Sequence, residues 1–375
     1  MYKNALSLLS LILLVLVDPV NAQTTVSGTR GVATERGVLD VASVVRSRIM
    51  AIDPADRPQE VHPPQPGPDK RTPLGPIVRQ PEVSLRPQSF QATAGTAPTL
   101  VASFPGLGDN NSSIPPDTHG AAGPNHLMVT LNTEVRIQDR TSNVISTVTL
   151  STFWSGFFNS RPFDPKILYD HMAGRWMFTA MGDPAASSSS VLIAVSQTTD
   201  PTGIWNIYRI DADAGNVAWA DYPSIAYNKD WIVIQVNMFT VSGSDFTGSD
   251  IYVFDKADLY AGGAGAFTLF QDFSGGFTQT PAITYDDTLS TMYLIEDWNG
   301  NEEGLGLLRL TTITGEVGSE VYTQDVAFPS TTDIWADDTP SNNFAPQSGT
   351  STRIMTNDAR MQNTVYRNGS LWCTH

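Results

Sequence analysis

The sequence predicts an all-β protein, a β-propeller made of four-stranded antiparallel blades. One observation is a motif with a constant period, in which a proline and then a tyrosine return every 58 residues, at Pro165, Pro223 and Pro281 and at Tyr169, Tyr227 and Tyr285. A fixed period of this length indicates a repeat architecture. The other is a series of short β-branched and aromatic runs divided by Gly, Pro, Asp and Ser, as expected of antiparallel strands and turns.

The composition fits this fold and excludes two classes of partner. Charged residues make up only 16% of the 375 residues, whereas Gly and Pro contribute 29 and 25. Such a balance is typical of a turn-rich β protein. Acidic groups outnumber basic ones by 38 to 22, giving a net charge of -16. Nucleic acids and anionic membranes select clustered Lys and Arg, so we expect neither as a partner.

The N-terminus predicts secretion. A single lysine, Lys3, precedes an apolar run over 5–17, and small residues lead to Ala22. This pattern is that of a secretory signal peptide over 1–22, cleaved after Ala22. A retained signal anchor is the alternative, although the run is short for a membrane span. The lone Cys373 has no partner for an internal disulfide, so the core alone must hold the exported fold together.

Residues 23–100 are expected to form a flexible N-terminal segment and a Pro-rich linker. One short helix-like patch covers 38–49, and eleven prolines follow between Pro54 and Pro98. A segment of this composition buries too little apolar surface to offset its ordering entropy. The propeller domain is therefore predicted to cover 101–375.

Four units of four strands and one shorter unit follow along the chain. The predicted strands are 116–120, 126–131, 134–138 and 144–150; 166–169, 175–181, 190–196 and 204–210; 224–227, 231–236, 251–254 and 267–270; 282–285, 291–296, 306–311 and 320–325; and 358–361, 364–366 and 369–372. The last unit stops inside a blade, which would leave an unpaired edge. We expect either a fragment of a longer chain or an edge that is covered by another element.

Asp117, Asp164 and Asp221 each open a predicted innermost strand. Because innermost strands line the channel of a propeller, these carboxylates are candidates for a ring at its mouth, where a ligand or a cation could bind. The structural alternative is that each aspartate caps a turn. His119 lies next to the ring and is a candidate ligand-binding residue that titrates near neutral pH, or else a polar residue of a tight turn. The fourth unit has Thr280 at this place, so the ring is incomplete.

A second candidate site follows the fourth unit's second strand. Oxygen-bearing side chains alternate at Asp297, Asn299, Asn301 and Glu303, which resembles the early spacing of a calcium loop. The distant bidentate glutamate is missing, and an Asn-Gly hairpin turn explains the stretch without metal. Calcium is thus the one cofactor that the sequence suggests. Trp298, inside this stretch, is expected to be exposed and suited to stacking on a sugar.

Several of these segments together resemble a group of secreted bacterial β-propeller proteins loosely described as sialidase-like. The segments are 115–126, Phe163-Asp164-Pro165 with Gly174-Arg175-Trp176, Asp200-Pro201-Thr202-Gly203 and Asp221-Tyr222-Pro223. The resemblance covers 114–375, and the greater size of many members implies a truncated chain. It implies no particular activity, because the nearest match to the Asp box of sialidases, over 196–205, has its spacing reversed.

Three functions remain open at this stage. The first is a secreted propeller that binds an extracellular glycan or protein through Asp117, His119, Asp164, Asp221 and Trp298. The second is a sialidase-like glycoside hydrolase that uses two of the carboxylates as acid and base. The third is a structural module of a larger surface protein. After cleavage of the signal peptide, no membrane partner is expected.

Overall fold

The computed structural model describes residues 23–47, 60–61, 77–79, 99–108, 110–154, 161–243, 245–302, 305–331 and 345–375. The predicted signal peptide, most of the predicted linker and Glu303 lie outside these ranges, so the expectations for them stay predictions. In the described part, no helix is long and apolar enough to cross a membrane.

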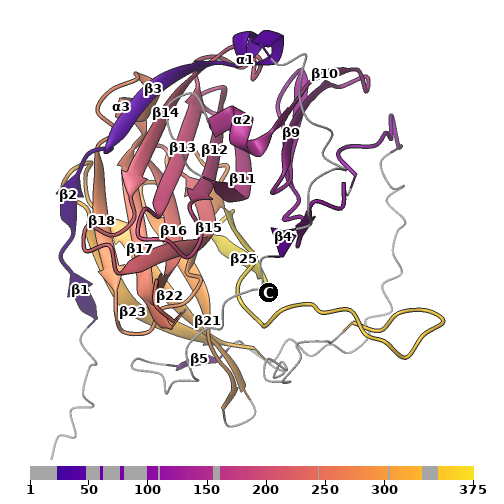
Figure 1. The fold of residues 1–375 in the computed structure, drawn as a ribbon. Helices are drawn as coiled ribbons and strands as arrows, with labels where there is room; N and C mark the ends of the chain where they lie inside the picture. The colour runs from indigo at the N-terminus through magenta and orange to yellow at the C-terminus, as the bar shows by residue number, and fades with distance from the viewer. Residues whose placement is uncertain are drawn as a thin grey trace, which may run out of the picture.

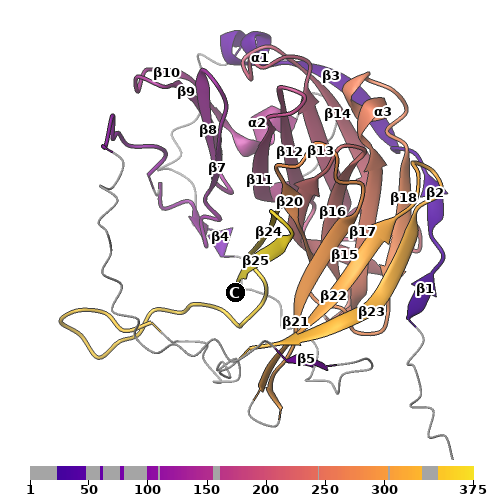
Figure 2. The same cartoon turned by 180° about the vertical axis from the view of Figure 1, so that it is seen from behind.

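The chain forms an all-β propeller with five blades, arranged around a common centre (Figures 1 and 2). Three blades follow the predicted pattern of consecutive antiparallel strands. The first contains β7 (His119–Ala122), β8 (His126–Thr130), β9 (Glu134–Asp139) and β10 (Val144–Thr149); the second contains β11 (Pro162–Asp170), β12 (Arg175–Gly182), β13 (Ser190–Ser196) and β14 (Ile204–Asp211); the third contains β15 (Ala218–Tyr227), β16 (Trp231–Thr240), β17 (Phe246–Asp255) and β18 (Phe267–Asp272).

The strand predicted at 282–285 does not open the fourth blade, because its residues 283–284 pair with the fifth blade and the two residues at 280–281 pair with the fourth. Residues 280–281 form β19 (Thr280–Pro281), which pairs with β21 of the fourth blade, and β20 (Ile283–Thr284) pairs in parallel with β24 of the fifth. The remaining strands are β21 (Met292–Glu302), β22 (Leu305–Thr314) and β23 (Val321–Ser330) in the fourth blade, and β24 (Asn363–Arg367) and β25 (Ser370–Thr374) in the fifth.

The segment at 24–47 differs from the flexible tail that the sequence predicted. β1 (Thr24–Val26) pairs with β23, β2 (Thr29–Gly31) with β18 and β3 (Glu35–Asp40) with β14, so the segment follows the outer edges of three blades (Figure 1). We call residues 24–40 the belt. Backbone hydrogen bonding to strand edges drives this pairing, and it requires no apolar pattern in the belt itself.

Short elements complete the fold. α1 (Val41–Ser47) follows the belt, α2 (Leu150–Trp154) follows β10, and α3 (Lys256–Tyr260) follows β17 with Asp255 as its N-cap. β4 (Glu60–Val61) pairs in parallel with β6 (Ser113–Ile114), and β5 (Ile77–Arg79) pairs in parallel with β23. The three α-helices of the described residues are five to seven residues long.

The core consists of the layers between blades. Every residue of β13 is buried, and β12 is buried after its first residue. Because neighbouring blades cover both faces of the second blade, its central strands are continuously apolar and do not alternate. Trp176 and Trp231 are fully buried, as predicted for blade packing. Trp372, the third tryptophan at this repeat position, is instead 67% exposed on β25.

Candidate functional site

The structure brings Asp117, Asp164 and Asp221 together at one end of the innermost strands. Asp117 comes just before β7, and the other two lie near the beginnings of β11 and β15. The Asp164 carboxyl is hydrogen-bonded to that of Asp117 and to that of Asp221. The first two side chains keep partial solvent exposure, whereas Asp221 is buried. We call these three residues the carboxyl cluster.

Local backbone geometry sets the position of each group. Asp117 and Asp164 have φ values of 47° and 49°, and Tyr222 has 53°. The β11–β12 register shifts between Phe163 and Lys166, and the β15–β16 register between Asp221 and Ser224. These shifts mark β-bulges, which redirect side chains at the inner edge. The structural counterpart of Asp164 in the third blade is therefore Tyr222, and the sequence alignment of Asp164 with Asp221 is wrong by one residue.

Asn132, which sequence reasoning missed, joins the first two blades. Its Nδ2 donates to a carboxylate oxygen of Asp117 and, at 3.0 Å, to the carbonyl of Pro115. Its Oδ1 accepts the backbone N–H of Asp164 at 2.7 Å. In the next blade, Oδ2 of Asp164 accepts the N–H of Tyr222 at 3.2 Å. Asp164 thus accepts a backbone N–H of the next blade and also belongs to the cluster, whereas the structural alternative expected it to cap a local turn.

The surroundings raise the pKa of all three carboxyls, each to a different value. Burial, and then the charge of Asp164, raise the pKa of Asp117 to about 8. Burial, and then the charge of Asp221, raise the pKa of Asp164 to about 7. For Asp221 burial raises the pKa to about 6, against the lowering effects of a hydrogen bond from Asp164 and of Arg360. Burial and the mutual approach of the carboxyls therefore favour the protonated form within the cluster, whereas Arg360 favours the ionised form of Asp221.

Two cations flank the cluster. The Lys166 ammonium lies 5.6 Å from the centre of the Tyr222 ring, and the Arg360 guanidinium lies 4.8 Å from the same ring. Arg360 is also bonded to Asp358, with both oxygens at 2.7 Å. The sequence signal for Arg360 was its place at 358–361, where the fifth unit repeats the opening of a blade.

His119 lies beside the cluster, as its position in the sequence suggested. Its Nδ1 accepts the backbone N–H of Ile167 at 3.2 Å. Burial, with a smaller effect of Lys166, lowers the pKa of His119 to about 4. The expectation that His119 titrates near neutral pH is therefore wrong, because the imidazole stays uncharged there.

Trp298 is 3% exposed, so the prediction that it is free to stack on a sugar is wrong. Its ring packs against Arg309, whose guanidinium carbon is 4.7 Å from the ring centre, and against Phe328. The stretch at 297–302 belongs to strand β21. Among the described residues, no group of three or more His, Cys, Asp or Glu is arranged to hold a metal. Calcium binding by Asp297, Asn299, Asn301 and Glu303 stays a prediction.

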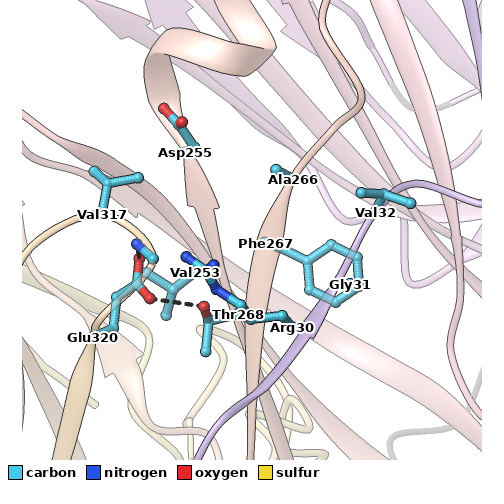
Figure 3. Close-up of a pocket in the computed structure, with 11 residues that line it drawn as sticks. Arg30, Gly31, Val32, Val253, Asp255, Ala266, Phe267, Thr268, Val317 and Glu320 are labelled. Atoms are coloured by element: carbon cyan, nitrogen blue, oxygen red, sulfur yellow. Dashed lines mark hydrogen bonds between the residues drawn. The ribbon is translucent and has the colours of Figure 1, made fainter.

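A separate pocket lies at the outer rim, between the belt and the third and fourth blades. Figure 3 shows its lining, which includes Arg30, Phe267, Thr268 and Glu320. The Thr268 hydroxyl donates to Glu320 at 2.7 Å across it. None of its lining residues belongs to the carboxyl cluster, so the pocket and the channel mouth are different sites.

The fold and this site define a class, a five-bladed β-propeller with a cluster of carboxyl groups at one mouth of its channel. No family model matches the sequence, and no curated protein matches it. The grouping with sialidase-like propellers is not supported by these comparisons.

Solved structures give distant matches. An endo-arabinanase of glycoside hydrolase family 43 (GH43) from Bacillus licheniformis has a TM-score of 0.33 and 16% identity, over 68% of this chain and 86% of that chain. An exo-1,5-α-L-arabinanase from a bovine ruminal metagenomic library has a TM-score of 0.33 and 11% identity, over 68% and 85%. A GH43 β-1,3-galactosidase with galactodeoxynojirimycin has a TM-score of 0.34 and 10% identity, over 62% and 81%. Likeness at this level assigns no activity.

Proposed function

We propose that this protein is a glycoside hydrolase whose catalytic groups are the carboxyl cluster. The observation that carries the proposal is the approach of three carboxyl groups, two of them partly exposed, at one end of the innermost strands, with the pKa of each raised chiefly by burial. Cleavage of a glycosidic bond needs an acid that protonates the leaving oxygen and a carboxylate that acts as base or nucleophile. Environments that separate the pKa values of neighbouring carboxyls provide both groups at one pH.

The pKa order assigns the roles. Asp117, with a pKa of about 8, is the proton donor. Asp221, with a pKa of about 6, is the ionised partner, and Arg360 favours its charged form. Asp164 lies between them and is hydrogen-bonded to both. We therefore assign Asp164 to holding the other two carboxyls in place and to setting their pKa values.

The test is hydrolysis of a panel of chromogenic glycosides and polysaccharides by the full chain. We expect Asp117→Asn and Asp221→Asn each to lower kcat/KM by roughly 10²- to 10⁴-fold. The activity should be highest between about pH 6 and pH 8, where Asp221 is ionised and Asp117 is protonated. The matched control is Asp230→Asn, at a half-buried turn position where the native carboxylate lies 3.6 Å from Lys229. Equal activity of the cluster variants and this control would refute the proposal.

The second candidate is a propeller that binds an extracellular glycan without cleaving it. The observation in its favour is that side chains of the site also hold neighbouring blades together. Asp164 accepts the backbone N–H of Tyr222, and Asn132 accepts the backbone N–H of Asp164. Retention of a glycan by the wild type in affinity electrophoresis, with no product released over days, would favour this candidate.

A further inference from the structure

The inner edge of β11 explains where the His119 ring lies. β11 is the terminal strand of its sheet and pairs only with β12. Backbone N–H groups of an edge strand point alternately toward and away from its partner. The N–H of Ile167 donates to Nδ1 of His119 from the first blade, so it points away from β12 toward the channel. The imidazole is therefore fixed at the inner edge of β11, against the backbone of Ile167.

This hydrogen bond also fixes the position of the imidazole proton. A nitrogen that accepts a hydrogen bond uses its lone pair, so the proton of a neutral imidazole is on the other nitrogen, Nε2. Burial keeps the pKa of His119 at about 4, so the ring is neutral at physiological pH. His119 consequently offers one N–H donor, at Nε2, and does not act as an imidazolium acid.

Lys166 offers further donors at the same place. It follows Asp164 by two residues on β11 and is half-buried. In the described part of the chain, its ammonium has no ion pair and no hydrogen bond; it lies 5.6 Å from the centre of the Tyr222 ring, and its charge lowers the pKa of Asp117 and Asp164. The other buried cations differ, because Lys256 is bonded to Asp170 at 3.1 Å and Arg309 to three carboxylates. The hydrogen-bonding capacity of Lys166 is thus unused by the protein.

The charge balance of the mouth favours an uncharged ligand. Arg360 is paired with Asp358 and also favours the charged form of Asp221, whereas the charge of Lys166 acts on Asp117 and Asp164. A sugar carboxylate would meet Asp221, the partly ionised Asp164 and a chain of net charge -16. Hydroxyl groups of a neutral sugar, in contrast, can accept from Lys166 and His119 and donate to Asp221.

We propose that His119 and Lys166 are the specificity-determining residues of this mouth, and that they bind hydroxyl groups of a neutral glycan. The assignment of substrate class rests on the proposed function of the carboxyl cluster, but the contacts themselves require only that a glycan binds. His119 donates through Nε2 and Lys166 through its ammonium, while Asp221 accepts.

Binding is the first test. Affinity electrophoresis of the full chain against arabinan, galactan, xylan and polygalacturonate measures retention independently of hydrolysis. We expect a neutral polysaccharide to be bound and polygalacturonate not. Lys166→Met and His119→Leu should each weaken binding by roughly tenfold to a hundredfold. His119→Gln, which can keep both an acceptor for Ile167 and a donor, should stay within about threefold of the wild type. The controls are His126→Gln and Lys229→Met, away from the cluster.

The second test is the tautomer of His119, because the proposed contact with a glycan needs the imidazole proton on Nε2. In ¹⁵N-labelled protein we expect the Nε2–H form of His119 between pH 6 and pH 8, with no titration in that range; assignment uses the His119→Gln variant. A charged imidazole at pH 6, or the Nδ1–H form, would overturn the proposal.

The outcomes separate this inference from the proposed function. Glycan binding that depends on Lys166 and His119 without any hydrolysis would support the inference and refute the hydrolase. Hydrolysis whose KM is unchanged in Lys166→Met and in His119→Leu would support the hydrolase and refute the inference. Preference for polygalacturonate would also refute the inference. Thermal melting of each variant shows whether it is folded. If Lys166→Met or His119→Leu unfolds the chain, Lys166→Arg and His119→Gln replace them in the binding measurement.

Discussion

Asp164→Asn should make the protein more stable at alkaline pH, although it removes a residue of the candidate site. Asparagine keeps an oxygen that can accept the N–H of Tyr222, so the link between blades is retained. What disappears is a carboxyl whose pKa is raised to about 7, with burial as the main cause. The native state therefore holds this proton more tightly than the unfolded chain, where the pKa is about 3.9.

The sign follows from proton linkage. Between about pH 4 and pH 7 the native state binds one more proton than the unfolded state at this residue, so the free energy of unfolding falls as the pH rises. Three units of pKa correspond to about 4 kcal/mol at full effect. Because Asp164 is partly exposed, we discount this to about 2 kcal/mol for solvent screening. Its removal also takes away a charge that raises the pKa of Asp117.

The assay is urea unfolding of wild type and Asp164→Asn at pH 5, 6, 7, 8 and 9. We expect the two free energies of unfolding to be similar at pH 5 and the variant to be more stable by about 2 kcal/mol at pH 8 and above. Asp213→Asn is the control, because backbone hydrogen bonds, acting against burial, lower the pKa of Asp213. Its effect should be destabilising and constant over this range. An Asp164→Asn difference that does not change with pH would refute the raised pKa of the cluster.

Three further predictions concern the rest of the fold. Arg309→Met should cost roughly 3–5 kcal/mol, because Arg309 is fully buried and bonded to Asp272, Glu296 and Asp325 at 2.7–2.8 Å. Arg209→Met removes a partly exposed pair with Glu35 and a hydrogen bond to the carbonyl of Ser188, and it should cost roughly 1–2 kcal/mol in urea unfolding. Equal costs would contradict the argument. In the belt, Leu39→Ala should cost roughly 2–5 kcal/mol, because Leu39 is 3% exposed and packs with the first and second blades. Val38→Ala, at a 53% exposed position, should change the free energy of unfolding by no more than about 0.5 kcal/mol. Similar small values for both variants would mean that the belt is not docked in solution. For the stretch at Asp297, calcium should raise the melting temperature of the protein and a chelator should reverse the rise. No change in either direction would refute calcium binding there.

The sequence determined the repeat and most of the strands. Four strands per unit follow from apolar runs between turn residues, and the observed β12 and β13 coincide with the predicted 175–181 and 190–196 to within one residue. The repeated openings of the blades also placed Asp117, Asp164 and Asp221 near one mouth, because the openings of successive units lie on one face, although the exact equivalence of Asp164 and Asp221 was wrong by one residue. These features depend on local patterns, which a single sequence contains.

The tertiary structure alone decided the features that depend on distant contacts. The belt pairs Glu35 with Arg209 and Thr24 with Gln324 through backbone groups. Backbone pairing of this kind requires no pattern of side chains that the sequence could reveal. Asn132, Lys166 and Arg360 belong to the site because bulges and neighbouring blades bring them there. The pKa values of about 8, 7 and 6 come from burial and from the mutual approach of the carboxyls. Trp298 is hidden by Arg309 and Phe328. Burial and the distances between charges are properties of the assembled blades. The sequence could therefore identify the residues of the cluster, but not their pKa values.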